Sequence, residues 1–431
     1  MVLTLIICAV TILLMVLSIF FVPSVRLGKF QMGGYCFFAL LGATLLLAFG
    51  CVSGEGVLNG LFGASGVNPV KILVLFLTMT VFSVFLDELG FFRYLASVAL
   101  RRAGSSQRTL FFLLYATVAV LTVFTSNDII ILTFTPFICA FARAARIDAL
   151  PYLFAEFFAA NTWSMTLLIG NPTNMYIASF LELDFFSYLS VMWLPTVAAG
   201  TLSLGILYAL FRRRLAAPIE APPPAAAPVA EKALLTVGVV HLALCILLLS
   251  ISSYIGLEMW WISLTLAATL MLCVLVYRRR RRESPVILVR TLRRMPWELV
   301  PFMLSMFLLV IALGENGVCD VLVSLLGERM PIAVYGVSSF LSANLINNIP
   351  MSVLFATLAE GVGLQGAAYA AVIGSNLGAC LTPVGALAGI MWADILRRER
   401  IPFDYRDFLR IGGIASLPTL AAALGVLALV L

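Results

Sequence analysis

The sequence predicts an all-α, polytopic membrane protein built from two halves of inverted topology. The 431 residues are 62% hydrophobic and only 11% charged, and the mean hydropathy of +1.08 is far above what a soluble domain needs to fill its core. A bilayer core of about 30 Å takes roughly 20 apolar residues per helix, and stretches of about that length recur along the chain. Basic residues cluster at the ends of these stretches, as membrane topology requires.

About ten spanning helices are expected, five in each half. The first stretch lacks a basic leading segment and a clear cleavage site, so we expect a retained span rather than a signal peptide. The spans expected in the first half are Val2–Val22, Tyr35–Val52, Val70–Leu86, Tyr152 to about Leu181, and Tyr188–Phe211. Those expected in the second half are Leu234–Ile251, Met259–Tyr277, Leu299–Leu313, Ala367–Ile395 and Ile411–Leu431.

Two further apolar stretches are typical of re-entrant hairpins, in which two short helices meet at a polar tip. The first, Leu110–Ala142 within 109–143, is flanked by arginines, so we expect it to enter from the cytoplasm. The second, Ala333–Leu358 within 332–363, has no basic residue between Arg329 and Arg397, so we expect it to enter from outside. The two halves would then run in opposite directions across the membrane, as in many secondary transporters.

From the charge pattern we expect a multi-pass protein of the cell's inner membrane whose chain consists of two repeats and a linker. Residues 1–211 form the first expected repeat and 233–431 the second, joined by a cytoplasmic Pro/Ala-rich linker at 212–232. Both chain ends are expected outside. The net charge of +6 follows from the cytoplasmic arginines, so no nucleic-acid role is assigned. The eight cysteines include no CxxC pair and indicate neither a disulfide set nor a zinc site.

Four polar segments interrupt the apolar stretches and carry the strongest functional signal. They span 124–136, 161–174, 344–350 and 374–385, and all contain Asn, Gly or Pro. We pair Asn127 with Asn347 (347 − 127 = 220) and Pro172 with Pro383 (383 − 172 = 211), nearly one offset for both. Unwound backbone within a membrane is tolerated only where protein or a water-filled cavity satisfies it, so these breaks indicate a cavity.

The polar side chains of these segments are the expected solute-binding groups. Half-helix ends offer free N–H groups to a polar ligand or carbonyl oxygens to a cation, and asparagine amides can do either. The alternative is that each Gly/Pro break is a packing kink. The expected substrate-binding residues are Ser126, Asn127, Asn161, Thr162, Asn171, Thr173, Asn174, Asn347, Asn348, Ser375, Asn376 and Thr382.

Asp128 is the expected cation-coupling residue, because a carboxylate at the bilayer centre is costly and is usually retained for function. Its alternative role is to cap the helix at the hairpin tip. Glu156 fits an interfacial role as well as a functional one. We expect packing roles for His241 and for Cys380. No cofactor and no metal site are expected, only a proton or sodium ion as coupling ion.

No enzyme is expected, because no nucleophile with a base and no carboxylate cluster lies near the motifs. The cavity would also lack a fixed cation, since no Lys or Arg lies between Arg108 and Arg143, or between Arg146 and Arg212. A bound anion would need helix dipoles or a co-bound cation, whereas a neutral polyol-like solute would not. An ion channel is the alternative from another class.

The motifs resemble those of the ion transporter superfamily, which joins arsenite permeases, sodium/proton antiporters and sodium-coupled dicarboxylate or citrate transporters. The Asn127–Asp128 pair, the following Thr135–Pro136 and the Asn347–Asn348–x–Pro350 segment resemble the arsenical pump membrane protein group in particular. The dicarboxylate branch carries Ser-Asn-Thr at both tips, which this chain does not. The Gly-Asn-Pro-Thr-Asn segment at 170–174 is more similar to the wider anion-permease branches.

The resemblance implies a secondary active transporter of a small inorganic solute, with arsenite or antimonite extruded in exchange for protons. The alternative within the superfamily is a sodium- or proton-coupled anion or carboxylate permease, or a sodium/proton antiporter. The partners it implies are the lipid bilayer and the small inorganic solute or anion. A homodimer and, for an arsenite pump, a soluble ATPase are the protein partners that it allows.

Overall fold

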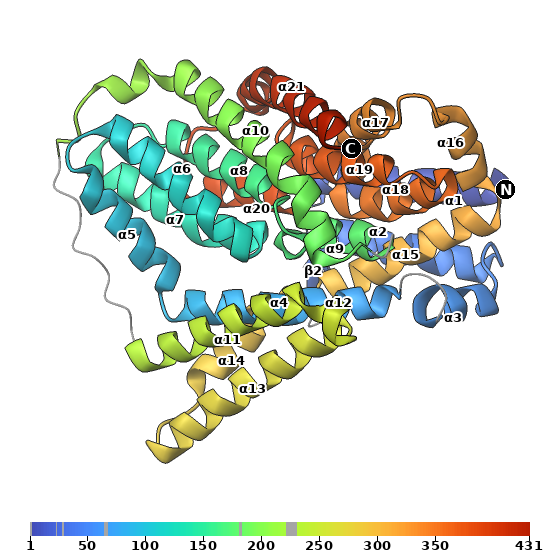
Figure 1. Cartoon of the computed structure of the whole chain (residues 1–431), viewed down its shortest axis with the longest axis horizontal. Coiled ribbons are helices and arrows are strands. Elements are labelled where there is room, and N and C mark those ends of the chain that lie inside the picture. The colour runs from blue at the N-terminus through green and yellow to red at the C-terminus, as the bar shows by residue number, and fades with distance from the viewer. Residues whose placement is uncertain (1, 23, 28–29, 64–67, 181–182, 221–230) are drawn as a thin grey trace.

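The computed structural model describes all residues except 1, 23, 28–29, 64–67, 181–182 and 221–230 (Figure 1). The described chain is helical apart from one β-hairpin, which confirms the predicted all-α fold. The first half contains α1 (Val2–Phe21), β1 (Ser24–Leu27), β2 (Phe30–Gly33), α2 (Gly34–Ala48), α3 (Gly54–Phe62), α4 (Pro69–Glu88), α5 (Phe91–Ala103), α6 (Gln107–Phe124), α7 (Asn127–Ala145), α8 (Leu150–Trp163), η1 (Leu168–Gly170), α9 (Pro172–Phe180), α10 (Phe185–Phe211) and η2 (Arg214–Ala216).

The second half repeats this order of helices. It contains α11 (Lys232–Ser250), α12 (Ser252–Ile255), α13 (Met259–Arg280), α14 (Val286–Arg294), α15 (Leu299–Glu315), α16 (Val318–Leu326), α17 (Pro331–Ile346), α18 (Asn348–Val362), α19 (Gln365–Gly378), η3 (Pro383–Gly385), α20 (Leu387–Arg398) and α21 (Tyr405–Val430).

The packing of the helices follows the same symmetry. α2 packs on α15 as α13 packs on α4, and α7 packs on α20 as α18 packs on α9. α6 packs on α8 as α17 packs on α19. The long helices α10 and α21 lie against each other between the two halves (Figure 1). Each hairpin therefore packs against the broken helix of the other half.

The register of the repeat differs from the predicted one at the broken helices. α8 and α19 each have 14 residues and begin at Leu150 and Gln365, so the offset is 365 − 150 = 215. The 3-10 turns have the same offset, since 383 − 168 = 215. Pairing Pro172 with Pro383 at an offset of 211 is therefore wrong: Pro383 corresponds to Leu168, because prolines start different pieces of the two broken helices.

Eight helices of the described residues are long and apolar enough to cross a membrane, and α1, α2, α17 and α18 contain shorter apolar stretches. Both arms of the first hairpin, α6 and α7, are among the eight. The spans predicted at Tyr152 to about Leu181 and at Ala367–Ile395 are each interrupted, by η1 and by η3. Leu181 itself lies outside the described residues. Short helices at the surface connect the spans, with basic residues on α5 and α14 and acidic residues on α3 and α16.

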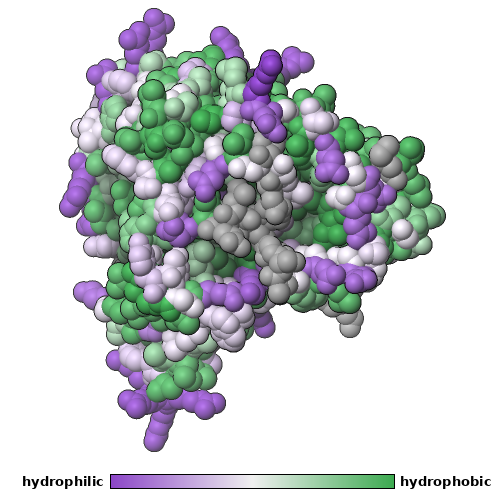
Figure 2. Space-filling view, turned by 45° about the vertical axis from the view of Figure 1, so that its right-hand side comes forward, coloured by the Kyte–Doolittle hydropathy of each residue, from purple (hydrophilic) through white to green (hydrophobic). Residues whose placement is uncertain are grey.

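The surface matches a lipid environment. The face in Figure 2 carries broad apolar areas, with hydrophilic residues at its upper and lower ends and in smaller groups elsewhere. Large exposed apolar side chains occur along α1, α11 and α13, among them Ile6, Leu247 and Leu272. Because lipid tails are as apolar as these side chains, contact with lipid carries no hydrophobic cost for them.

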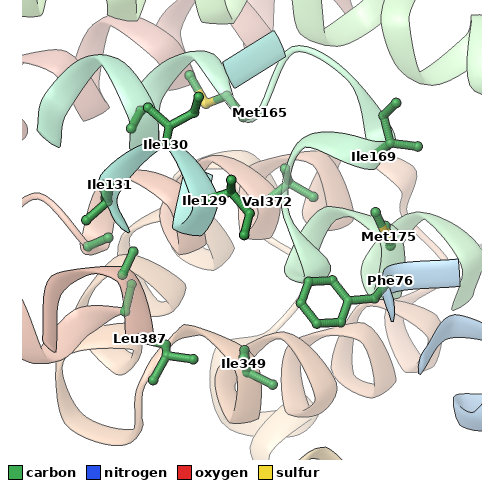
Figure 3. Packing of buried hydrophobic residues seen from close by; sticks show 14 of the residues in the cluster. Phe76, Ile129, Ile130, Ile131, Met165, Ile169, Met175, Ile349, Val372 and Leu387 are labelled. Atoms are coloured by element: carbon green, nitrogen blue, oxygen red, sulfur yellow. The ribbon is translucent and has the colours of Figure 1, made fainter. Parts of the chain in front are cut away.

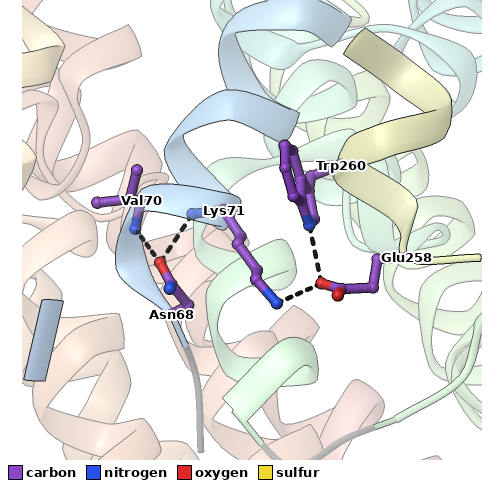
Figure 4. A network of polar contacts seen from close by, with 5 residues as sticks. All are labelled: Asn68, Val70, Lys71, Glu258 and Trp260. Carbon is purple, nitrogen blue, oxygen red and sulfur yellow. Dashed lines mark hydrogen bonds and ion pairs between the residues drawn. The ribbon is translucent and has the colours of Figure 1, made fainter. Parts of the chain in front are cut away.

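A polar network ties the start of α4 to the start of α13 (Figure 4). Asn68 caps α4 by accepting hydrogen bonds from the N–H groups of Val70 and Lys71. Glu258, just before α13, accepts from Lys71 Nζ at 2.5 Å and from the indole of Trp260 at 2.8 Å. These donors hold the pKa of the Glu258 carboxyl below its ordinary value. The pair is half-exposed, so its contribution to stability is small, about 0 to 1 kcal/mol.

Glycines allow α17 and α19 to pack closely. A Cβ on Gly374 of α19 would lie 1.9 Å from the hydroxyl oxygen of Ser339 and 2.5 Å from the carbonyl oxygen of Gly336, both on α17. One turn later, a Cβ on Gly378 would lie 2.8 Å from the carbonyl oxygen of Phe340. Small residues four apart let the backbones of membrane helices approach closely and gain van der Waals contact.

We therefore expect Gly374→Ala to lower the thermal midpoint of the detergent-purified protein. The added methyl group cannot fit without separating α17 from α19, a cost of about 1 to 3 kcal/mol. Gly425→Ala on α21 is the matched control, because no heavy atom lies within 4 Å of its Cβ position. The control should leave the midpoint unchanged or raise it, and equal midpoints for the two variants would contradict the packing argument.

Candidate functional site

Prolines and extended residues produce the two broken helices. α8 ends at Trp163, and the chain continues through η1 to Asn171, whose backbone is extended (φ −151°) directly before Pro172. In the other half, Thr382 is extended (φ −137°) directly before Pro383. A proline sterically disfavours the helical conformation of the residue directly before it. The local sequence therefore accounts for both breaks. Each break leaves helix ends with unpaired backbone groups inside the membrane.

The hairpin tips are equally abrupt. Between α6 and α7, Thr125 and Ser126 are extended, and α7 begins at Asn127. Between α17 and α18, Asn347 has φ +71° and ψ 155°, a strained conformation that few residues other than Gly adopt. Its amide nitrogen donates to the carbonyl oxygen of Val384 in η3 at 3.1 Å. The second tip is thereby tied to the broken helix of its own half.

Asn376 joins the two broken helices across the repeat. Its Oδ1 accepts from the hydroxyl of Ser164 at 2.8 Å and from the amide of Asn171 at 3.0 Å. Its Nδ2 donates to Oδ1 of Asn174 at 2.7 Å. Asn174 in turn donates to the carbonyl oxygens of Ser164 and Leu167, both in the segment where α8 is broken. Asn174 thus satisfies unwound backbone of the first half, and Asn376 of the second half holds Asn174 in place.

Asn161 and Asn127 connect the first tip to the same region. Asn127 Nδ2 donates to Asn161 Oδ1 at 3.1 Å, and Asn161 donates to the carbonyl oxygen of Phe157. With the offset of 215, Asn161 corresponds to Asn376, so the repeat places an asparagine at the same position in both halves (161 + 215 = 376). Thr382 donates to Asn344 Oδ1 at 2.6 Å.

Several predicted residues are buried with a polar atom that has no hydrogen-bond partner within the described chain. An unpaired buried polar atom costs about 1 to 3 kcal/mol, so such atoms are suited to a ligand that completes them. They come from both hairpin tips and from both broken helices. The atoms are Ser126 Oγ, Thr162 Oγ1, Thr173 Oγ1, Asn348 Oδ1 and Ser375 Oγ.

Two small internal cavities lie at the hairpin tips, and the repeat relates them. Ser126, Ile169, Pro172 and Met175 line the first, and Asn347, Val384, Leu387 and Ile390 line the second. The correspondence is residue by residue, since 126 + 221 = 347 and 169 + 215 = 384, with 348 − 127 = 221 as the offset of the hairpins. Each has a volume of about 10 Å³, enough for about one water molecule.

The two cavities differ in their remaining walls. α4 adds Thr80 and Ser83 to the first cavity, next to Thr125 and Ser126. The second cavity instead has Tyr35 of α2 and Phe302 of α15, so Asn347 is its main polar group. Both lie within an apolar shell (Figure 3), whose residues include Phe76, Ile129, Ile130, Met165, Ile169, Met175, Ile349, Val372 and Leu387.

Asp128 lies in the first turn of α7, partly buried, where the positive end of the helix dipole favours a carboxylate. Its side chain has no hydrogen-bond or ion-pair partner within the described residues, and Tyr35 is within electrostatic reach. The residue in the capping position is Ser126, not Asp128, and it makes no capping hydrogen bond either. The geometry therefore gives Asp128 no capping role.

The structure places the remaining candidate residues, Glu156, His241 and Cys380, in different environments. Glu156 is completely buried in α8, so an interfacial position is wrong for it. His241 of α11 is bonded to the carbonyl oxygen of Val237 on its own helix, away from the motifs. Cys380 is completely buried next to the second break. No cluster of three or more His, Cys, Asp or Glu side chains that could hold a metal occurs in the described parts of the chain.

Ser164, Asn344 and Tyr35 are the site residues that the motif analysis did not select. Ser164 and Asn344 lie inside the polar segments, but nothing in their spacing distinguished them from residues that merely pack. Tyr35 lies in a different span and reaches the second cavity only through the tertiary fold. No pattern in the sequence links it to the hairpin tips.

Fold and site together define a class: an all-α, multi-pass membrane transporter with inverted halves and paired broken helices. The chain belongs to the family described as Citrate transporter (CitMHS), whose model matches residues 34–373. Similarity to known proteins extends over most of the chain, and its location in the inner membrane follows from this family and its apolar helices.

The relatives include proteins named Arsenical pump membrane protein. One from Yersinia enterocolitica is 30% identical over 371 residues, which are 82% of this chain and 85% of the relative. One from Escherichia coli is 28% identical over 408 residues, 91% of this chain and 92% of the relative. Among solved structures, the YdaH transporter of Alcanivorax borkumensis has the same fold, with a TM-score of 0.59 at 15% identity over 99% of this chain and 97% of that one.

We expect Asn376→Ala to abolish transport and to lower the thermal midpoint. The substitution removes the acceptor of Ser164 and Asn171 and the donor to Asn174, each a buried group that costs about 1 to 3 kcal/mol when unpaired. Asn59→Ala on the exposed face of α3 is the control and should change neither quantity. Solute flux in proteoliposomes and a melting curve measure the two effects, and a fully active Asn376→Ala protein would argue against the central role of this side chain.

Proposed function

We propose that this protein extrudes arsenite or antimonite in exchange for protons, with Asp128 as the coupling residue. The observation that carries the proposal is that Asp128 is the only charged residue in the four polar motifs and lies without a partner at a hairpin tip. A carboxylate in that position can alternate between charged and neutral forms as protons arrive and leave. The names of the relatives supply the substrate class.

The site is built for a small, hydroxylated, uncharged solute. Its buried groups are asparagine amides and Ser or Thr hydroxyls, which can both donate and accept hydrogen bonds. No Lys or Arg lies in the motifs. Arsenous acid near neutral pH is a neutral trihydroxide, so three hydroxyl groups could pair with these amides and hydroxyls without a counter-charge.

Alternating access would move the motif-bearing elements against the scaffold helices. The motif-bearing elements are the hairpins α6–α7 and α17–α18 and the broken helices α8–α9 and α19–α20, which pack on one another across the repeat. In the described conformation the cavities at the tips each hold no more than about one water molecule, so neither has room for the solute. Solute release would require one hairpin to separate from the broken helix of the opposite half.

Asp128→Asn should abolish proton-driven solute flux while leaving the protein folded. The amide keeps the shape of the side chain but cannot release a proton, so an imposed pH gradient would no longer drive transport. Asp320→Asn on the exposed part of α16 is the matched control and should transport normally. The measurement is arsenite and antimonite flux with proton flux in proteoliposomes, and full activity of Asp128→Asn would remove it from the coupling role.

A second candidate is a sodium- or proton-coupled permease for a carboxylate, which the family's description as citrate transporter favours. A carboxylate would need a co-bound cation, because the motifs provide no fixed positive charge. The same proteoliposomes decide between the candidates. Sodium-dependent flux of citrate or a small dicarboxylate, with no metalloid flux, would favour this second function.

A further inference from the structure

Glu156 is a buried carboxyl group that the proposed solute site does not use. It lies on α8 with no solvent exposure. Its Oε1 accepts a hydrogen bond from the hydroxyl of Thr135 on α7 at 2.8 Å, and its Oε2 has no hydrogen-bond partner in the described structure. Trp392 of α20 lies next to the same carboxyl, and its indole nitrogen has no hydrogen-bond partner in the described structure. Three motif-bearing helices therefore meet at this one group.

No positive charge balances Glu156. It forms no ion pair with any described residue, and the other titratable side chain next to it is Cys139 of α7. Tyr115 of α6, Tyr188 of α10 and Tyr369 of α19 direct their hydroxyls to backbone carbonyls elsewhere, at Gly200, Met165 and Ser187 respectively. The charged residues on the helices packed around α8 lie at the hairpin tip or at the aqueous ends: Arg108, Asp128, Arg143, Asp394, Arg397, Arg398, Arg406, Asp407 and Arg410.

Packing alone does not require a carboxyl group at this position, because the equivalent junction in the second half is closed without a carboxyl group. The offsets of 215 and 221 equate Glu156 with Ala371 (156 + 215), Trp392 with Ile177 (392 − 215) and Thr135 with Ala356 (135 + 221). These three counterparts are also completely buried. The second half therefore closes the same junction with apolar side chains, while the first half keeps an acid, a hydroxyl and an indole.

Glu156 lies between the solute site and the cytoplasmic surface. It is six residues into α8 from Leu150, about 9 Å along the helix axis. Leu150 lines a surface cavity of about 650 Å³ together with Arg143, Asp148, Arg398 and Glu399. Thr135, Cys139 and Arg143 follow one another at four-residue spacing on α7, and Arg143 pairs with Glu399 at 2.9 Å. One face of α7 therefore leads from the carboxyl to this cavity.

We propose that Glu156 is a second proton-carrying site of the transport cycle, which exchanges its proton with the cytoplasm along the junction of α7, α8 and α20. This proposal rests on proton-coupled transport as proposed above. The carboxylate takes up one proton to become the neutral acid, which suits its uncompensated burial in the described conformation. When α7 and α20 separate, water from the cavity reaches the group, and the neutral acid releases the same proton to it.

The test is the Glu156→Gln variant, with Asp394→Asn at the exposed cytoplasmic end of α20 as the matched control. Glutamine has the shape of the neutral acid and can accept the hydrogen bond of Thr135, so the variant should fold, which a melting curve checks. Two readouts are needed. Infrared difference spectra between acidic and alkaline pH should show a carbonyl stretch of Glu156 in the wild type and in the control that is missing from Glu156→Gln, while any band of Asp128 is common to all three proteins.

The second readout is flux in proteoliposomes, with arsenite as the probe. Glu156→Gln should lose at least tenfold in efflux driven by a proton gradient, whereas arsenite exchange in the absence of a gradient should continue. Glu156→Asp should restore part of the driven flux. If the Glu156 band titrates in the wild type, but no proton-driven flux occurs with any solute, Glu156 stands as a group that exchanges a proton with the cytoplasm, and the proposed function fails together with the role of Glu156 in it.

Two results would overturn the proposal while leaving the proposed function intact. One is a carboxylic acid band assigned to Glu156 that never changes with pH, which would make the group a permanently neutral structural acid. The other is a folded Glu156→Gln variant with the driven flux and the pH profile of the wild type.

Discussion

Backbone that leaves a helix inside a bilayer must find hydrogen-bond partners within the protein, and this requirement organises the whole molecule. The breaks of α8 and α19 expose carbonyl and amide groups where water is scarce. The asparagine side chains of the motifs meet that need, Asn174 for the carbonyls of Ser164 and Leu167, and Asn347 for that of Val384. The packed hairpins, the close contact of α17 with α19 and the apolar shell of Figure 3 keep these polar groups together.

The same requirement explains how structure and transport can share residues. A helix break that is fully satisfied by the protein would be a rigid kink, whereas this site leaves several buried hydroxyl and amide atoms unpaired. Their pairing energy becomes available only when a ligand or water enters. The two cavities at the tips are too small for a large solute in this conformation. Binding and conformational change are therefore linked through the same atoms.

Much of this could be predicted from the sequence, because the signals involved are local. Apolar length located most of the helices, and Asn, Gly and Pro marked the breaks at 161–174 and 374–385, whereas the sides of the membrane deduced from the arginines stay a prediction. The register of the repeat could not be obtained from prolines, since Pro172 and Pro383 start different pieces of their broken helices. The environment of Glu156 also depends on Thr135 and Trp392, which are distant in sequence and meet only through helix packing.

Asn376 has a further consequence for how the chain can vary. Its amide must present oxygen toward Ser164 and Asn171 and nitrogen toward Asn174. One side chain of the second half therefore forms hydrogen bonds with three residues of the first half. A change at Asn376 removes all three bonds, and a change at Ser164, Asn171 or Asn174 removes one of them. At this point the two halves therefore have to match each other, whereas at Glu156 and Ala371 the repeat holds different side chains. Fusion in one chain keeps the matched halves in the same molecule.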